Sequence, residues 1–287
     1  MKLQKEDIND IEELGKEISP KEIKIEKKLV YIRKKRRILF IPNKYTREKQ
    51  KLLLRILSKI KLPNYIFSKK GKSYIDMAKF HLGDEYLINL DIKDFYPSIH
   101  NKRLIVFFQK LGISIESSKN LGFLTSIERQ VPQGFITSPI LSNLIFLEVD
   151  KYIFSLLNSR KIKYSRYVDD ITISSHKSIN LKLIDKIEKI LRSKGFKLNK
   201  NKTDIYNDSE IKTVLGLQLK TDHLDISTSY LEKVGDDINW LYIFKQNGIE
   251  DDFLISRLKG EVNFIKQVNP NTYQGVVDKL DSDKLFV

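Results

Sequence analysis

Cysteine is absent from this 287-residue chain. Without it the chain can form no disulfide, bind no zinc through thiolates and use no thiol nucleophile. A chain without cysteine also fits a reducing compartment, so we expect the protein to be cytoplasmic.

Long apolar runs are missing as well. The N-terminal segment MKLQKEDINDIEELGKEI is charged throughout and has no apolar stretch of the kind that signal peptides contain. The most apolar run, residues 135–157, is interrupted by Pro139, Asn143, Asp150 and other polar residues. Because a bilayer span needs about 20 nearly uninterrupted apolar residues, we expect a buried helix here and no membrane segment.

Negative charge is scarce relative to positive charge. The chain has 52 Lys and Arg against 37 Asp and Glu, which gives a formal net charge of +15. Such an excess favours polyanionic partners, and nucleic acid is the first of these. The alternative explanation is a lysine-rich composition that the whole proteome shares.

The apolar residues recur with periods typical of helices in some segments and of strands in others. In the middle of the chain the order is a buried strand, helices, a hairpin, a helix and a further strand, which is close to the split βαβ pattern of a mixed sheet. The expected helices cover residues 8–18, 53–60, 102–111, 117–127, 138–157, 181–194 and most of 228–287, with a helix start at 19–22. The expected strands are two runs flanking a basic turn at 33–37, and residues 85–92, 164–175 (a hairpin), 204–206, 212–219 and 224–226.

Three aspartates fall at the ends of these strands. Asp91 ends the strand predicted over residues 85–92, and Asp169 and Asp170 lie at the tip of the predicted hairpin. If the strands are neighbours, the carboxylates converge and raise each other's pKa unless a cation neutralises them. Mg²⁺ prefers such oxygen ligands, and the backbone carbonyl of Ile92 could add one more. The alternative is that adjacent aspartates are ordinary solvated turn residues.

Five blocks of sequence surround these aspartates in a fixed order. The blocks are NLDIKDFYPSIH (89–100), VPQGFITSPILSNLIF (131–146), YSRYVDD (164–170), KGFKLNKNKT (194–203) and TVLGLQL (213–219). They resemble the palm motifs of the reverse transcriptase family, over roughly residues 31–219, and the helical remainder resembles the thumb of that family.

Within that family, the chain resembles the small bacterial enzymes, namely retron and related defence-associated reverse transcriptases. RRILFIP (36–42) is similar to their fingers segment, and LKGEVNFIKQVNPNTY (258–273) to the end of a retron thumb. The retron N-A-x-x-H block is present as MAKFH, with Met77 in place of Asn, and the V-T-G block as VLG. Leu-Gly is the form of group II intron and other bacterial enzymes, so both branches stay open.

The resemblance implies an α+β fold with the right-hand polymerase architecture: fingers, a palm with a split βαβ, ferredoxin-like sheet, and a helical thumb. It predicts an N-terminal helical extension over residues 1–28, fingers and palm over 29–227, and the thumb over 228–287.

The resemblance also implies catalytic roles. Asp91 and Asp169 would hold two Mg²⁺ ions, with the Ile92 carbonyl as a further ligand and Asp170 completing the cluster. Lys202 would protonate the leaving pyrophosphate. Because two other lysines lie within five residues of Lys202, a solvated lysine surface is the alternative explanation for it.

Four residues are implied to bind the incoming dNTP. Arg37 would grip the triphosphate, with one more cation from residues 33–36. Tyr96 would be the steric gate against a 2′-OH, and Gln133 and Gly134 would flank the nucleotide. The alternatives are a solvated basic turn for Arg37, a core position for Tyr96, and a simple turn for Gln133 and Gly134.

Three further residues are implied to lie near nucleic acid. His81 would contact the template or support the fingers, although a lone histidine is as often structural. Leu215 and Gly216 would belong to the primer grip, where a close backbone turn presses on the primer end.

The implied function is RNA-directed DNA polymerisation on a partner structured RNA, in a retron or related anti-phage defence system. The expected partners are a structured non-coding RNA, the RNA/DNA hybrid, dNTPs and an effector protein. Two alternatives stay open: template-independent or protein-primed DNA synthesis, and an RNA-binding scaffold with a vestigial palm.

Overall fold

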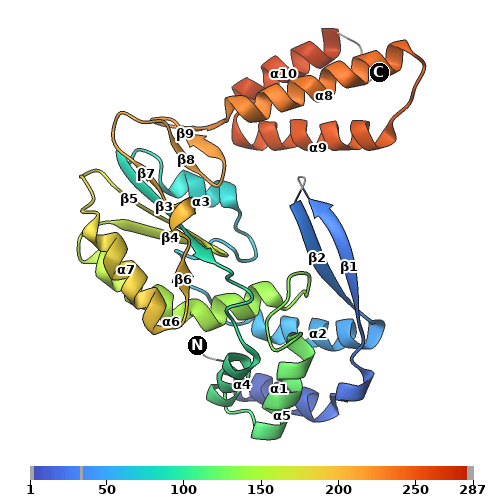
Figure 1. Cartoon of the computed structure of the whole chain (residues 1–287), viewed down its shortest axis with the longest axis vertical. Helices are drawn as coiled ribbons and strands as arrows, with labels where there is room; N and C mark the ends of the chain where they lie inside the picture. Colours follow the sequence, from blue (N-terminus) through green and yellow to red (C-terminus); the bar gives the residue numbers. More distant parts are fainter. Residues whose placement is uncertain (1–2, 33–34, 283–287) are drawn as a thin grey trace. The chain divides into compact units, whose positions relative to one another are not determined.

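The computed structural model describes residues 3–32 and 35–282 (Figure 1). The chain divides into two compact units, each made of several segments. The first unit consists of Met1–Lys72, Leu90–Ile171 and Asn180–Thr203, and the second of Ser73–Asn89, Thr172–Ile179 and Asp204–Val287. The predicted boundaries of the N-terminal extension, the fingers and palm, and the thumb stay a prediction.

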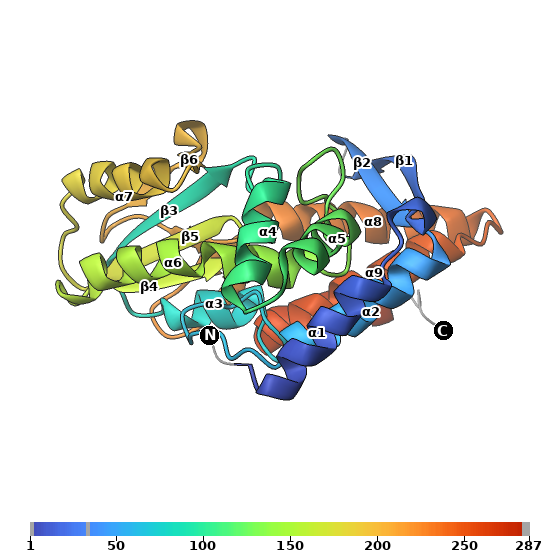
Figure 2. The same cartoon turned by 90° about the horizontal axis from the view of Figure 1, so that it is seen from below.

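Four helices pack together in the first unit, and Figure 2 shows α1 and α2 beside one another. Their buried faces carry apolar residues such as Ile11, Leu53 and Leu121. Gly15 permits the close approach of α1 to α5, because a Cβ there would lie 2.5 Å from the Cβ of Ser117. The four helices are α1 (Lys5–Glu17), α2 (Lys44–Leu57), α4 (Asn101–Lys110) and α5 (Ile115–Thr125).

An antiparallel hairpin precedes α2. β1 (Ile25–Ile32) pairs with β2 (Lys35–Pro42), with Ile25 opposite Pro42. The predicted basic turn over residues 33–37 is therefore wrong in its extent, because residues 35–37 are part of β2. The backbone pairing of β2 with β1 continues through these residues, from Val30 opposite Arg37 to Ile32 opposite Lys35. The helix start predicted at residues 19–22 is a single 3₁₀ turn, η1 (Pro20–Glu22).

The main sheet has five strands, in the order β4-β5-β3-β6, with β7 also pairing with β3. Chain order runs from β3 through helices to the β4–β5 hairpin, then α7, β6 and β7, so the predicted α+β arrangement is confirmed. The strands are β3 (Tyr86–Lys93), β4 (Lys163–Tyr167), β5 (Asp170–Ser175), β6 (Lys197–Leu198) and β7 (Asp204–Tyr206).

Two helices of the first unit accompany this sheet. α6 (Ser138–Asn158) contacts β4, and α7 (Lys182–Ser193) contacts α6 and β6. Pro139 stands in the first turn of α6, where its missing N–H costs nothing. The expectation of a buried helix in this apolar run is confirmed by its buried residues, among them Leu144 and Ile153.

The second unit contains a small sheet of three strands, in the order β10-β9-β8, against which α3 (Tyr74–Phe80) packs. The single strand predicted over residues 212–219 is instead a hairpin. Leu215 and Gly216 both have positive φ, 51° and 84°, which suits the two central residues of a tight hairpin turn. The strands are β8 (Lys212–Val214), β9 (Leu217–Leu219) and β10 (Leu224–Ile226).

Three helices complete the second unit, with breaks near Gly248 and at Asn269. The Asp225 carboxylate joins β10 to the start of the last helix, since it accepts hydrogen bonds from Asn269 Nδ2 at 3.1 Å and Thr272 Oγ1 at 3.0 Å. The helices are α8 (Thr228–Gln246), α9 (Asp252–Val268) and α10 (Pro270–Ser282).

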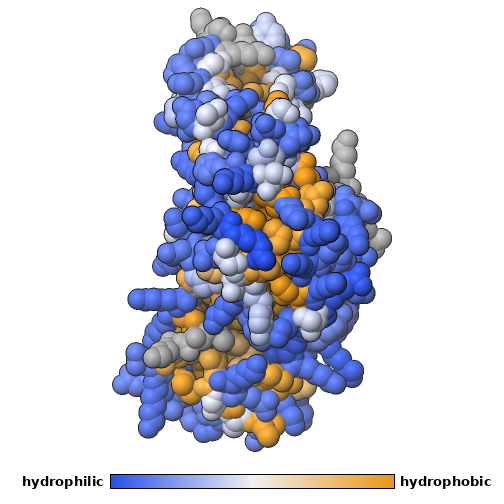
Figure 3. Space-filling model, turned by 90° about the vertical axis from the view of Figure 1, so that its left-hand side faces the viewer, coloured by the Kyte–Doolittle hydropathy of each residue, from blue (hydrophilic) through white to orange (hydrophobic). Residues whose placement is uncertain are grey.

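Apolar residues are mostly buried in both units. Among the described residues, no helix is long and apolar enough to cross a membrane. The face in Figure 3 is largely hydrophilic, and its hydrophobic residues gather in separate patches.

Candidate active site

The turn between β4 and β5 places Asp169 and Asp170 beside β3. The backbone N–H of Ile92 donates a hydrogen bond of 3.0 Å to the carbonyl of Asp169, so the strand end that carries Asp91 lies against this turn. Val168 has φ of +57°, which is rare for a β-branched residue. The expectation that the two strands are neighbours is confirmed.

The carboxylates of this turn are hard to ionise together. Burial, followed by the charges of Asp169 and Asp91, raises the pKa of Asp170 to about 7. Burial also raises the pKa of Asp169, with a further contribution from Asp91. Lys202 opposes both shifts. A cation bound here would therefore relieve repulsion that the protein alone does not cancel.

Asp91 is buried and held by two side chains. Asn199 Nδ2 donates to its Oδ1 at 2.8 Å, and Lys202 Nζ donates to its Oδ2 at 3.1 Å. The backbone N–H of Asn199 also donates to the Asp91 carbonyl at 2.8 Å. The hydrogen bond to Asp91 is the main cause that raises the pKa of Lys202, with the charges of the three aspartates adding to it.

Asn199 is a site residue that the sequence reasoning missed. It directly follows β6, whose Leu198 pairs with Ile92 on β3. The signal was present in the sequence, since Asn199 lies in the same block as Lys202. Only the strand register, however, places its amide beside Asp91.

The donor set of this turn fits Mg²⁺ in its chemistry. Its groups are carboxylate oxygens with raised pKa values, which are the hard ligands that Mg²⁺ takes. Within the described part of the chain, however, no three Asp, Glu or His side chains converge on one point as they stand. Lys202 Nζ lies 3.1 Å from Oδ2 of Asp91 and supplies a positive charge beside this carboxylate.

Tyr96 lies half-buried near this turn. Burial raises the pKa of its hydroxyl, the Asp169 charge adds to the shift, and a hydrogen bond with Ser142 opposes it. Its neighbour Phe95 is the core residue of the pair, with its ring centroid 5.4 Å from that of Phe146 and 6.0 Å from that of Phe196. Tyr96 therefore stands at the border between the aromatic core and the carboxylates.

Gln133 and Gly134 lie in an exposed turn before α6. Gly134 has φ of +106°, and a Cβ there would lie 3.1 Å from the carbonyl oxygen of Phe40 on β2. Glycine is thus required both by conformation and by the close approach of β2. Ser138 Oγ donates to the Pro132 carbonyl at 2.7 Å and fixes the turn at the start of the helix.

Arg37 is described only in its backbone, which lies in β2 opposite Val30. Its side chain lies outside the described part of the structure, so its contact with a triphosphate stays a prediction.

The expectation that His81 contacts nucleic acid is corrected. The side chain has no exposed surface, and its Nδ1 lies 2.5 Å from Ser174 Oγ, which donates to Asp84 Oδ2 at 2.5 Å. A buried ring in a hydrogen-bond network has no surface to offer a template, which agrees with the structural alternative. Leu215 and Gly216, by contrast, form the β8–β9 turn, where Gly216 is exposed.

An antiparallel sheet with acidic residues at the ends of two adjacent central strands, and with helices beside it, is typical of the palm of nucleic-acid polymerases. Residues 25–219 match the family model described as reverse transcriptase (RNA-dependent DNA polymerase). The chain therefore belongs to the reverse transcriptase family, and its class of activity is RNA-directed DNA polymerisation.

Curated relatives place the chain among bacterial enzymes of this family. It is 28% identical over 247 residues to Retron Ec86 reverse transcriptase of Escherichia coli, covering 85% of this chain and 75% of that protein. It is 34% identical over 197 residues to Retron Se72 reverse transcriptase of Salmonella heidelberg, covering 65% of this chain and 52% of that protein. The chain is thus a bacterial, retron-like reverse transcriptase.

Solved structures agree on the fold. Apo telomerase from Candida tropicalis, truncated from its C-terminal domain, has a TM-score of 0.56 at 16% identity, covering 76% of this chain and 59% of that one. The foamy viral protease-reverse transcriptase in complex with double-stranded DNA has a TM-score of 0.52 at 17% identity, covering 90% of this chain and 38% of that one. At such identities the likeness shows the polymerase fold alone.

Proposed function

We propose that this chain copies a partner structured RNA into DNA by two-metal nucleotidyl transfer, within a retron or a related anti-phage defence system. The observation that carries the proposal is the contact of β3 with the β4–β5 turn. The Ile92 N–H bonded to the Asp169 carbonyl sets Asp91 beside Asp169 and Asp170.

The three aspartates and the Ile92 carbonyl would hold the two Mg²⁺ ions. When bound, Mg²⁺ polarises phosphoryl oxygens and offsets the charge that develops during an in-line displacement. Two changes in the protein would accompany binding. Asp170, whose pKa is about 7, would bind an ion as the carboxylate, and Lys202 would release Asp91 Oδ2, which it bonds at 3.1 Å without the metal.

Lys202 is suited to supply a proton to the leaving pyrophosphate. Its raised pKa keeps Nζ protonated at neutral pH, and its side chain is 62% exposed, so it can swing toward a ligand. Proton donation to the leaving oxygen lowers the charge that must be stabilised there.

The nucleotide would lie over Tyr96 and the turn of Gln133 and Gly134. A rigid ring at Tyr96 beneath the sugar would exclude a 2′-OH and so select dNTPs. Gln133 would donate a hydrogen bond, and Gly134 would let the chain pass close to the nucleotide. Arg37 would clamp the triphosphate, since a guanidinium fork matches phosphate oxygens.

Template and primer would bind through the positive charge of the chain. A net charge of +15 supports binding along two phosphate backbones, with affinity that falls steeply as salt rises. The β8–β9 turn, with Leu215 and Gly216, would press on the primer end. The partner RNA, an effector protein and a cytoplasmic location belong to the same proposal, and the likeness to retron reverse transcriptases supports its RNA template.

Primer extension tests the proposal. Purified protein is given Mg²⁺, dNTPs and an RNA template with an annealed primer, with Asp91→Ala as the inactive control. We expect full-length product from the wild type and none from Asp91→Ala. We also expect the wild type to reject ribonucleotides and Tyr96→Ala to incorporate them more readily. Product formed without template would favour template-independent or protein-primed synthesis. Phage protection that survives Asp91→Ala would favour the scaffold alternative.

A further inference from the structure

Arg166 is the largest of the fully buried side chains among the described residues, and it lies on β4, three residues before Asp169. Its guanidinium has no exposed surface. Burying a charge of this kind is costly unless it is paired and its donors are satisfied. The hydrogen-bond acceptors of the guanidinium explain why an arginine is buried here.

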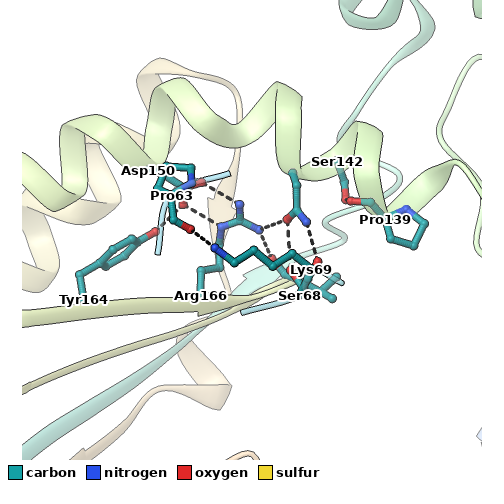
Figure 4. A network of polar contacts seen from close by, with 10 residues as sticks. Pro63, Ser68, Lys69, Pro139, Ser142, Asp150, Tyr164 and Arg166 are labelled. Atoms are coloured by element: carbon teal, nitrogen blue, oxygen red, sulfur yellow. Dashed lines mark hydrogen bonds and ion pairs between the residues drawn. The ribbon is translucent and has the colours of Figure 1, made fainter. Parts of the chain in front are cut away.

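Four hydrogen bonds hold the guanidinium (Figure 4). Nε donates to Asp150 Oδ1 and Nη2 to Asp150 Oδ2, both at 2.7 Å, which is the bidentate geometry of a strong pair. Nη1 donates to Asn143 Oδ1 at 3.0 Å and to the carbonyl of Val168 at 2.8 Å. The first three bonds anchor the side chain on α6, and the fourth reaches the turn that carries Asp169.

The anchor itself is well supported. Asp150 also accepts a hydrogen bond of 2.5 Å from the Tyr164 hydroxyl. Asn143 Nδ2 donates to the Ser68 carbonyl at 2.8 Å. The backbone N–H of Arg166 donates to the Tyr65 carbonyl at 2.9 Å. The guanidinium is therefore fixed from α6, from β4 and from the segment before α3.

The turn needs such support because Val168 is strained. A β-branched residue at φ of +57° is held there only by its surroundings. The Val168 carbonyl belongs to the peptide group that leads into Asp169, and the Asp169 carbonyl accepts the Ile92 N–H. The peptide groups on either side of the Asp169 side chain are thus both fixed by hydrogen bonds.

We propose that Arg166 is a positioning residue of this reverse transcriptase, which holds the Val168–Asp169 peptide so that the Asp169 carboxylate faces Asp91. The proposal rests on the function proposed above. Lysine cannot replace the guanidinium, because one ammonium group cannot serve Asp150, Asn143 and Val168 in a single plane.

The test compares Arg166→Lys with Arg192→Lys. Arg192 makes an exposed pair with Glu188 on α7, so its variant controls for the substitution itself. The first readout is the Mg²⁺ concentration at half-maximal rise in melting temperature, which requires no RNA. The second is kcat in primer extension at saturating Mg²⁺. Groups that orient metal ligands typically change affinity or activity by about 10–100-fold when removed. For Arg166→Lys we expect the Mg²⁺ midpoint to rise and kcat to fall by factors of that size. For Arg192→Lys we expect neither to change.

Two further variants separate positioning from stability. Tyr164→Phe removes one hydrogen bond to Asp150 Oδ1 and leaves the four bonds of the Arg166 guanidinium in place, so it should lower the melting temperature without changing the Mg²⁺ midpoint. Asn143→Ala keeps the ion pair of Arg166 with Asp150 but removes the hydrogen bond from Arg166 Nη1 to Asn143 Oδ1. It should therefore raise the Mg²⁺ midpoint, and it tests the proposal even if Arg166→Lys fails to fold.

The proposal is overturned if folded Arg166→Lys or Asn143→Ala binds Mg²⁺ and turns over like the wild type, or if Mg²⁺ does not stabilise the wild type. A wild type that Mg²⁺ stabilises but that extends no primer contradicts the proposed function instead. In that case the Mg²⁺ midpoints still decide the role of Arg166.

Discussion

Asp169 and Asp170 are adjacent in the sequence but unequal in their surroundings. The Asp169 carbonyl accepts a hydrogen bond from the Ile92 N–H, and the Val168 carbonyl just before Asp169 accepts one from Arg166. Asp170, by contrast, begins β5 and has a pKa of about 7. A carboxyl group that is partly protonated at neutral pH is closer in charge to an amide than a fully ionised carboxylate is. We therefore expect Asp169 to be the direct bridging ligand and Asp170 the more replaceable one.

The prediction is that Asp170→Asn keeps measurable incorporation while Asp169→Asn has none. The difference in single-turnover rate at saturating Mg²⁺ should be at least about tenfold. The reverse order of the two variants would show that the ligand roles are assigned wrongly.

The raised pKa of Asp170 also makes stability depend on pH. Between the ordinary value of 3.8 and about 7, the unfolded chain has lost this proton while the folded chain keeps it. The free energy of unfolding should therefore fall as pH rises through this window. The stability that Asp170 gives the folded chain through its tighter proton binding is fully present only below the window. Because the site is partly open to water, we expect a loss on the order of 2 kcal/mol, less than the full shift implies.

Denaturant unfolding in EDTA at about pH 5 and about pH 8 measures this loss. Asp170→Asn lacks the titrating group, so its free energy of unfolding should fall less than that of the wild type. If the free energy of unfolding changed equally with pH in the two proteins, the pKa of Asp170 would not be raised.

Lys202 can be tested against a neighbour of the same type. Lys202→Met should lower kcat about 100-fold, as expected for loss of a general acid, and should remove the high-pH limb of the rate profile. Lys200→Met is the matched control, since Lys200 pairs with Glu188 at 3.2 Å rather than with Asp91. Equal effects of the two variants would favour the alternative of a solvated lysine surface.

At the scale of elements, the sequence predicted long, strongly periodic segments well and short irregular ones poorly. α6 follows from an apolar run that is too long for a strand, and the β4–β5 hairpin follows from two β-favouring runs next to Asp169 and Asp170. The hairpin inside residues 212–219 was missed, because Leu215 gives no sign in its side chain that its φ is positive. The contacts of Asn199 and Arg166 depend on strand register and on packing between distant segments, which local patterns do not contain.

The β8–β9 hairpin has an attachment that can be tested. Asn89 Nδ2 donates to the Thr213 carbonyl at 2.7 Å, and its Oδ1 accepts from Thr172 Oγ1 at 2.8 Å. Asn89→Ala leaves both partners unsatisfied, so we expect a loss of about 1–3 kcal/mol in the free energy of unfolding. Asn207→Ala, at an exposed site in the loop before β8, should cost far less. Equal losses in the two variants would mean that Asn89 does not hold the hairpin.

At the scale of the whole molecule, composition predicted the kind of partner and the five motif blocks predicted the family. The matched residues, 25–219, begin close to the start of the predicted similarity at residue 31 and end at the same residue. The two compact units could not be predicted, because each is assembled from segments that are far apart in the sequence.

The central claim is that this carboxylate site synthesises DNA under the direction of an RNA template. The most direct measurement sequences the products made by wild type and Asp169→Asn on two RNA templates that differ at a defined block of bases. We predict wild-type products that change with the template as its complement, and no product from Asp169→Asn. Identical wild-type products on both templates, or equal synthesis by Asp169→Asn, would contradict the claim.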